Sequence, residues 1–241
     1  MTLTPDQVVY WSWGPFDLSA TIVFTWVVMA ILVGGSWLIS RRLNAGAEIS
    51  PWQNLAEIVV MGMRSQIREI GGPGADRYLP LVGTLFLFIA VSNLLDVVPG
   101  YHPPTGSLMT VAALALCGAV AVPVYGIASR GLIGYLEQYI RPTPLMLPFQ
   151  VIGEVSRTLA LAVRLFGNVM SGSMIVGLLL AITPFVVPVV MQLLGMLTGM
   201  VQAYIFPVLV MVYIASATKV SPGAPPEQSP PAQDAAQEGV D

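Results

Sequence analysis

The stretch LAVRLFGNVMSGSMIVGLLLAI, residues 161–182, decides the fold class because a single arginine lies inside an otherwise apolar run. Residues 165–218, which follow Arg164, include no charged residue. A helix that crosses a bilayer needs about 20 mainly apolar residues, and this run provides them. Arginine keeps its proton at any ordinary pH. The sequence therefore places a permanent positive charge within a membrane-spanning segment.

The composition of the whole chain agrees with this interpretation. The chain has 241 residues, of which 55% are hydrophobic and 10% are charged, and its mean hydropathy is +0.76. A soluble domain carries about 25% charged residues. We therefore expect an integral, multi-pass membrane protein. The net charge of −3 comes from a C-terminal tail that holds Glu227, Asp234, Glu238 and Asp241.

Several classes of function are not indicated by the residues available. No block of basic residues suggests nucleic-acid binding. The one cysteine, Cys117, lies in an apolar run, and the one histidine, His102, cannot build a metal site alone and is expected to be an interfacial loop residue. We expect no disulfide, metal or cofactor. No positively charged segment precedes the first apolar stretch, so no cleavable signal peptide is predicted.

Hydropathy predicts an all-α membrane protein with five crossings. The predicted spans are residues 18–39, 78–98, 108–129, 145–182 and 184–217. A straight helix of about 35 residues is roughly 50 Å long, whereas the hydrocarbon core is about 30 Å thick. The last two spans must therefore tilt strongly, overhang the core, or kink at Pro188 and Pro207.

The remaining segments flank a single membrane domain, predicted over residues 18–218. Residues 1–17 form an outer N-terminal segment in which Trp11 and Trp13 suit a membrane interface. Residues 51–70 mix apolar and charged positions and predict an amphipathic helix. Residues 130–142 look interfacial, and residues 219–241 have the composition of a disordered cytoplasmic tail. No internal repeat is present.

The distribution of basic residues predicts the orientation of the chain. With the N-terminus outside, one side of the membrane receives Arg41, Arg42, Arg64, Arg68, Arg77, Arg130, Arg141 and Lys219. The segments on the other side, residues 1–17, residues 99–107 and the turn near Thr183, contain no lysine or arginine. Cytoplasmic loops carry the excess of basic residues. We therefore expect an outer N-terminus and a cytoplasmic C-terminus.

Four charged residues fall within or at the end of the predicted spans: Asp96, Glu154, Arg157 and Arg164. A charge at the centre of a membrane costs about 2.5–3.5 kcal/mol on insertion scales, so each is a functional candidate. Glu154 precedes Arg157 by three residues, and an ion pair between them explains both as well as an ion path does. Asp96 is either a solvated helix end or the lining of an aqueous access from outside.

The helix that carries Arg164 has a polar face. At about 100° per residue, Arg157 and Ser171 lie about 20° from Arg164, and Gln150 and Asn168 lie about 40° from it. Small residues between them allow a close helix–helix seam, which is the alternative to a functional ladder. A seam alone does not explain two arginines.

Arg164 has no acid within helical reach, so its partner is Asp96, another subunit or water. On the last span, Gln202 lies as far after Thr183 as Arg164 lies before it. An antiparallel hairpin therefore places the two side chains level. Gln202 is predicted either to hydrogen-bond Arg164 or to join the two helices to each other.

Three segments of the chain resemble one known family. SRTLALAVRLFGNVMSG (residues 156–172), VQAYIFPVLVMVYI (residues 201–214) and SNLLDVVPGYHPPTGSL (residues 92–108) resemble the a subunit of F-type ATP synthases, the membrane stator beside the rotating c-ring. The resemblance covers most of residues 78–218. Its most specific part is R-L-F-G-N followed by Q-A-Y-I-F.

The resemblance implies roles for particular residues. Arg164 matches the family's essential arginine, Asn168 the asparagine after it, and Gln202 the glutamine that faces it. Arg157 and Glu154 match positions that are usually basic and acidic, and Asp96 falls where some members carry an aspartate.

The resemblance also implies a setting in the cell. The expected partners are the c-ring, the b subunits of the peripheral stalk, the F1 sector indirectly, and membrane lipids. The expected location is the bacterial inner membrane.

The chain departs from the family pattern at three positions. Ser173 stands where many members have a carboxylate, Gly195 where some have a histidine, and Gln150 where glutamate is frequent. The resemblance therefore implies that the ion paths use Asp96, Ser171, Ser173 and water. The coupling ion is a proton or, as in a sodium-type lineage, sodium.

The resulting hypothesis is a non-catalytic subunit in which two aqueous half-channels meet near Arg164. No glycine-rich phosphate loop occurs, so ATP chemistry is assigned to partner subunits. A stand-alone secondary ion transporter also places charges inside the membrane. A purely structural assembly subunit is the third possibility.

Overall fold

A computed structural model describes residues 9–13, 16–41, 51–72, 74–98, 101–140, 146–182 and 186–218. Its α-helices are α1 (Ala20–Arg41), α2 (Pro51–Gly71), α3 (Leu79–Leu95), α4 (Leu108–Ile140), α5 (Met146–Ile182) and α6 (Val186–Thr218). Two short 3₁₀ helices, η2 (Ala75–Tyr78) and η3 (Pro104–Gly106), lie before α3 and α4. In this described part, five helical segments are long and apolar enough to cross a membrane. The predicted all-α membrane protein is confirmed.

One local feature has no counterpart among the elements predicted from the sequence. Strands β1 (Val9–Trp13) and β2 (Phe16–Ser19) pair antiparallel immediately before α1. Their aromatic and β-branched residues favour an extended backbone. The side chains of Trp11 and Trp13 lie outside the described residues, so their interfacial role stays a prediction.

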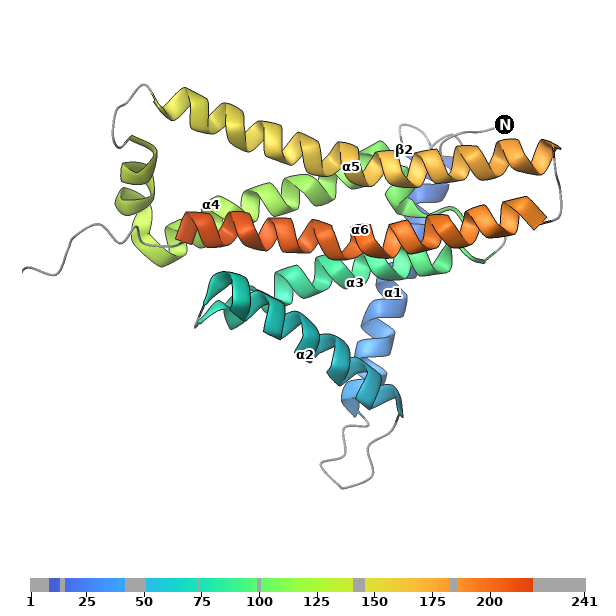
Figure 1. Ribbon diagram of the computed structural model, residues 1–241, viewed down its shortest axis with the longest axis horizontal. Coiled ribbons are helices and arrows are strands. Elements are labelled where there is room, and N and C mark those ends of the chain that lie inside the picture. Colours follow the sequence, from blue (N-terminus) through green and yellow to red (C-terminus); the bar gives the residue numbers. More distant parts are fainter. Residues whose placement is uncertain are drawn as a thin grey trace, which may run out of the picture.

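Helix α6 is the centre of the arrangement. It contacts α3, α4, α5 and α2, and α5 runs antiparallel to it (Figure 1). Phe206, Val210, Met211 and Ile214 of α6 are almost completely buried. Much of α5, by contrast, is exposed, because it is covered mainly on the faces toward α4, α6 and η3. A long exposed face on an apolar helix leaves room for lipid or another subunit.

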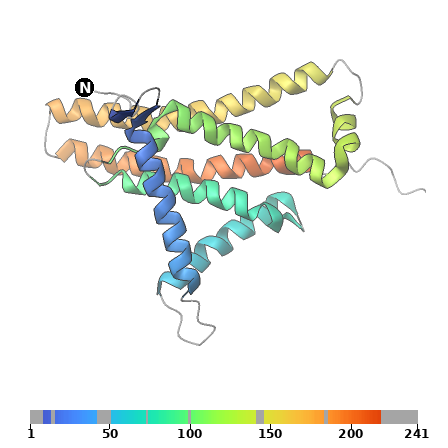
Figure 2. The same cartoon turned by 180° about the vertical axis from the view of Figure 1, so that it is seen from behind.

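Helix α1 crosses the α3–α6 group steeply, as both views show (Figures 1 and 2). Helices that cross so steeply cannot all stand along the membrane normal. If α1 spans the bilayer upright, α5 and α6 are strongly inclined. This arrangement provides the tilt that their length requires.

Helix α4 is interrupted near its end. Gly131 has φ 75° and ψ 164°, which are not helical values, so α4 consists of two helices joined at this residue. The second piece folds back, so that a Cβ on Gly126 would lie 2.6 Å from the ring of Tyr135. The predicted end of the span near residue 129 is confirmed, while the interfacial location of the following segment stays a prediction.

The prolines act differently from one another. Pro188 lies in the first turn of α6, where proline is tolerated, so the expected kink does not arise there. Pro207 lies inside α6, and Pro123, at which no kink was predicted, lies inside α4. The turn near Thr183 and the predicted tail lie outside the described residues.

Candidate ion-translocation site

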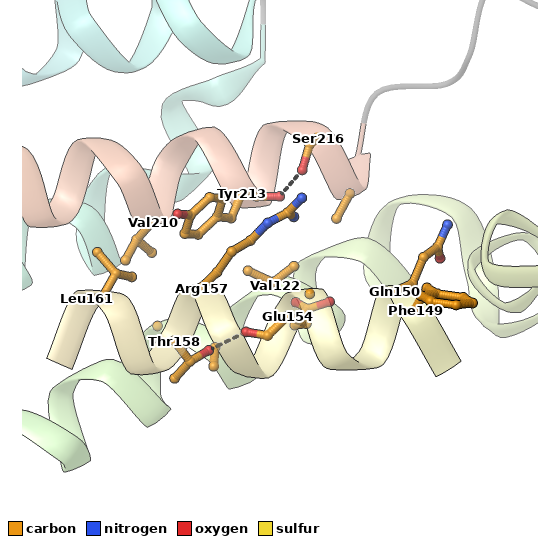
Figure 3. A pocket seen from close by; sticks show the side chains of 14 residues that line it. Val122, Phe149, Gln150, Glu154, Arg157, Thr158, Leu161, Val210, Tyr213 and Ser216 are labelled. Carbon is orange, nitrogen blue, oxygen red and sulfur yellow. Dashed lines mark hydrogen bonds between the residues drawn. The ribbon is translucent and has the colours of Figure 1, made fainter. Parts of the chain in front are cut away.

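A cavity of about 310 Å³ with a mixed polar and apolar lining opens between α4, α5 and α6 near the end of α6 (Figure 3). Helix α5 contributes two predicted site residues, Glu154 and Arg157, together with Gln150, to the same wall. Helix α6 contributes Tyr213 and Ser216. The predicted orientation puts this end on the cytoplasmic side, and we call the space the inner cavity.

Arg157 reaches across the inner cavity toward Tyr213 and Ser216 (Figure 3). Its guanidinium carbon lies 5.4 Å from the centre of the Tyr213 ring, which is within range of a cation–π contact. Two hydroxyls that line the cavity donate hydrogen bonds to backbone carbonyls of their own helices. Ser216 Oγ donates to Tyr213 O at 2.8 Å, and Thr158 Oγ1 donates to Glu154 O at 2.9 Å. The ion pair between Glu154 and Arg157 stays a prediction.

A second cavity, of about 380 Å³, opens toward the other end of the α5–α6 pair. We call it the outer cavity. It brings together residues of α3, α5, α6 and the segment after α3, and its polar lining consists of Asn93, Asp96, Tyr101, His102, Asn168, Ser173 and Gln192. The predicted site residues Asp96, Asn168 and Ser173 therefore line the same cavity, although Asp96 is distant from the other two in the sequence. Gly195 lines the same space.

Side-chain amides hold the outer cavity together. Asn93 Nδ2 donates to the carbonyl oxygen of Gly199 at 2.7 Å, in a buried bond between α3 and α6. Gln192 Nε2 donates to the backbone oxygen of Asp96 at 2.9 Å. These bonds fix the end of α3 against α6. Gly199 permits the close approach, since a Cβ there would lie 3.1 Å from the Asn93 amide.

Asp96 follows the last residue of α3 and lies just beyond the membrane span. Its side chain is half-buried, and burial raises the pKa of its carboxyl, because desolvation disfavours the charged form. The neighbouring His102 acts in the opposite direction and lowers the same pKa. Asp96 is thus a partly exposed helix end that also lines a cavity, and its role in an aqueous access from outside stays a prediction.

Arg164 and Gln202 lie between the two cavities. On α5, the inner lining ends at Leu161 and the outer lining begins at Asn168. On α6, the outer lining ends at Gly199 and the inner lining begins at Val210. The antiparallel register expected from the sequence is thus consistent with the order of residues along both walls.

The two side chains differ in exposure. Arg164 is exposed beside the buried face of α5 formed by Leu161 and Leu165, whereas Gln202 is only 6% exposed. Among the described residues, none forms a hydrogen bond or ion pair with Arg164. The expected hydrogen bond between Arg164 and Gln202 is therefore absent. Gln202 Nε2 is buried and has no hydrogen-bond partner within the described chain.

The hydroxyls of Ser171 and Ser173 are turned toward the backbone of their own helix, α5. Ser171 is exposed, and its Oγ donates to Asn168 O at 3.2 Å. Ser173 Oγ lies 3.0 Å from the carbonyl oxygen of Met170. Ser173 lines the outer cavity, while Ser171 does not.

Three further residues, which the sequence does not single out as parts of a site, reach the outer cavity: Tyr101, His102 and Gln192. His102, expected to be only an interfacial loop residue, thus lies beside predicted site residues. No local pattern identifies these three residues, because the packing of α1, α3 and α6 brings them to the cavity.

The fold and the two cavities define a multi-pass helical membrane protein with a charged residue between two partly polar cavities. The family described as ATP synthase A chain matches residues 22–215. ATP synthase subunit a 2 of Acaryochloris marina is 60% identical over 220 residues, covering 91% of this chain and 94% of its own. ATP synthase subunit a of Albidiferax ferrireducens is 57% identical over 230 residues, covering 95% of this chain and 98% of its own.

A third relative, ATP synthase subunit a 1 of Chlorobaculum parvum, is 59% identical over 219 residues, covering 91% of this chain and 97% of its own. The chain belongs to the family of F-type ATP synthase a subunits, as the three resembling segments indicated.

Proposed function

We propose that this chain forms the ion path of the membrane sector of an ATP synthase, with two half-channels that meet at Arg164. The observation that carries the proposal is the pair of cavities, each lined in part by polar or charged side chains, on either side of Arg164 and Gln202. Asp96, Asn168 and Ser173 line the outer half-channel. Glu154, Arg157 and Gln150 line the inner one, and Ser171 lies on the face of Arg164.

The partner of Arg164 in this proposal is a carboxylate of the c-ring that arrives and leaves as the ring turns. The exposed position of Arg164 and its lack of a partner in the described chain support this role. The carboxylate stays neutral in lipid, where a charge is costly, and ionises near the opposite charge. At about 4 Å and an effective dielectric near 20, the attraction is about 4 kcal/mol.

Arg164 also repels cations, so it prevents a direct leak from one cavity to the other. Desolvation and water in the cavities weaken the attraction enough for rotation to continue. A lysine is a compact charge that loses its proton more readily when buried, so it serves less well here. The arginine thus both triggers release of the ion and separates the two half-channels.

The proposal places the chain in a multi-subunit complex of the bacterial inner membrane. The exposed face of α5 contacts the c-ring, the b subunits of the peripheral stalk hold the chain, and the F1 sector is coupled to it indirectly. The N-terminus is outside and the C-terminus is cytoplasmic. The chain has no catalytic role in ATP chemistry.

The coupling ion is a proton or sodium. Ser173 and Gly195 place groups that do not titrate inside the outer cavity, at positions where the family pattern often has a carboxylate and sometimes a histidine. Comparing ATP-driven pumping with and without added sodium decides between the two ions.

The test of the proposal is the variant Arg164→Ala in a reconstituted complete ATP synthase. We expect loss of ATP-driven ion pumping, because no other described residue between the two linings supplies a fixed positive charge. Arg164→Lys is expected to couple poorly. Arg41→Ala is the matched control, since Arg41 is exposed at the end of α1 and stacks on Trp37, away from both cavities.

Retention of coupled pumping by Arg164→Ala would refute the proposal and favour a purely structural subunit. A stand-alone transporter is a separate alternative. It predicts ion flux by the isolated chain in liposomes, without a c-ring that co-purifies.

A further inference from the structure

His102 lies at the mouth of the outer cavity, in the segment between α3 and η3. Its side chain is exposed, whereas Asp96 and Asn168 of the same lining are half-buried. His102 is thus one of the exposed residues of this lining, and it shares the cavity with Asp96.

Helix α1 holds this segment in place. The ring of Phe24 lies 6.3 Å from the ring of His102 and 4.9 Å from the ring of Tyr101, the latter edge-to-face. Edge-to-face aromatic pairs at such distances are favourable. The segment that carries His102 is thus packed against α1, and it lines the same cavity as Asp96.

The charge at the mouth depends on very few groups. Among the described residues of the lining, the ones that titrate are Asp96, Tyr101 and His102. Burial raises the pKa of Tyr101 to about 12, so its hydroxyl stays neutral. Helices α5 and α6 contribute uncharged side chains, such as Asn168, Ser173 and Gln192. Asp96 and His102 alone therefore set the net charge of this described surface.

We propose that His102 controls how strongly the outer mouth attracts the coupling cation, by cancelling or releasing the negative charge of Asp96. A neutral imidazole leaves the carboxylate to draw a cation in. A protonated imidazole offsets the charge of the carboxylate within the same cavity and leaves no net charge. Histidine is the side chain that changes charge within about pH 5–8, so the control responds to the pH outside the membrane. This inference rests on the proposed function.

The test measures ATP synthesis by the complete, reconstituted enzyme under a potassium diffusion potential. The pH of the compartment that faces the outer mouth is varied between about 5 and 8, the range in which histidine titrates, while the other compartment is held constant. The readout is the rate of His102→Gln divided by that of the wild type at the same pH. This ratio removes the direct effect of proton concentration on the driving force.

We expect the ratio to rise severalfold from the alkaline to the acid end, because only the wild type acquires the cancelling charge. His102→Lys carries a fixed charge and should lower the rate at the alkaline end. In an Asp96→Asn variant, the rate should fall at the alkaline end, because the carboxylate that draws the cation in has been removed. When the concentration of the coupling cation is varied, His102→Gln should change the apparent KM for the cation rather than kcat.

A flat ratio would overturn the inference, as would an unchanged rate of Asp96→Asn at the alkaline end. A ratio below one at every pH would show instead that His102 passes protons to Asp96. These outcomes are distinct from failure of the proposed function. That failure requires coupled activity in Arg164→Ala, whereas a flat ratio in an otherwise coupled enzyme rejects only the role of His102.

Discussion

At the scale of single residues, Gln202 and Asn93 show how similar amides have different tasks. Both are buried, but Asn93 Nδ2 donates to the Gly199 carbonyl, whereas Gln202 Nε2 has no partner in the described chain. A buried polar group without a hydrogen bond costs about 1–3 kcal/mol. Gln202 thus weakens the fold locally, at the point where the two cavities approach each other.

We expect Gln202→Leu to leave the thermal midpoint of the purified complex unchanged or raised while ATP-driven pumping falls. The reason is that leucine removes an unsatisfied amide and fills a buried position. Asn93→Leu is the matched control. It loses a hydrogen bond worth about 0.5–1.5 kcal/mol, so its thermal midpoint should fall. A lower midpoint for Gln202→Leu, with pumping intact, would contradict a functional role.

At the scale of elements, the break in α4 is set by a backbone conformation. Gly131 combines φ 75° with ψ 164°, a region of the backbone map that is open essentially to glycine alone. The break turns the following helix back, so that Tyr135 packs against Gly126 of the same element. The length of the third apolar span is thereby limited without a proline at its end.

We expect Gly131→Ala to destabilise the chain by about 1–3 kcal/mol, because alanine is strained at this φ and ψ. Gly34→Ala in α1 is the control: a Cβ there meets no atom within 4 Å, and alanine favours a helix. The measurement is the thermal midpoint of the complex in detergent. Equal midpoints for the two variants would argue against strain at Gly131.

At the scale of the whole molecule, α5 and α6 cross α1 steeply and carry a cavity toward each end (Figure 1). The two cavities share no lining residue and lie at different positions along the pair. Arg164 lies between their linings on α5. Two separate half-channels, as proposed, require such an offset.

Cysteine labelling tests the offset directly. After the exposed Cys117 has been replaced by alanine, Ser173→Cys should react with a membrane-impermeant thiol reagent from the outer side only. Ser216→Cys should react from the cytoplasmic side only, because Ser216 lines the inner cavity. Labelling of both cysteines from one side would reject the predicted orientation and the two half-channels together.

Much of the fold follows from local features of the sequence. Apolar runs of sufficient length predict the five membrane-spanning helices, and the end of the third span near residue 129 agrees with the break at Gly131. The helical period places Gln150 and Arg157 on one face of α5, and both line the inner cavity. The pairing of β1 with β2 is not predicted, since a short polar and aromatic stretch has no decisive periodicity.

The sequence by itself determined that the chain is a multi-pass helical membrane protein with Arg164 in its fourth apolar span, because hydropathy and helical period are properties of neighbouring residues. Only the tertiary structure decided that Asp96, His102 and Ser173 share one cavity and that Gln202 is buried without bonding Arg164. The reason is physical. Which side chains meet across α1, α3, α5 and α6 depends on how the helices cross and pack, and no local pattern specifies those crossings.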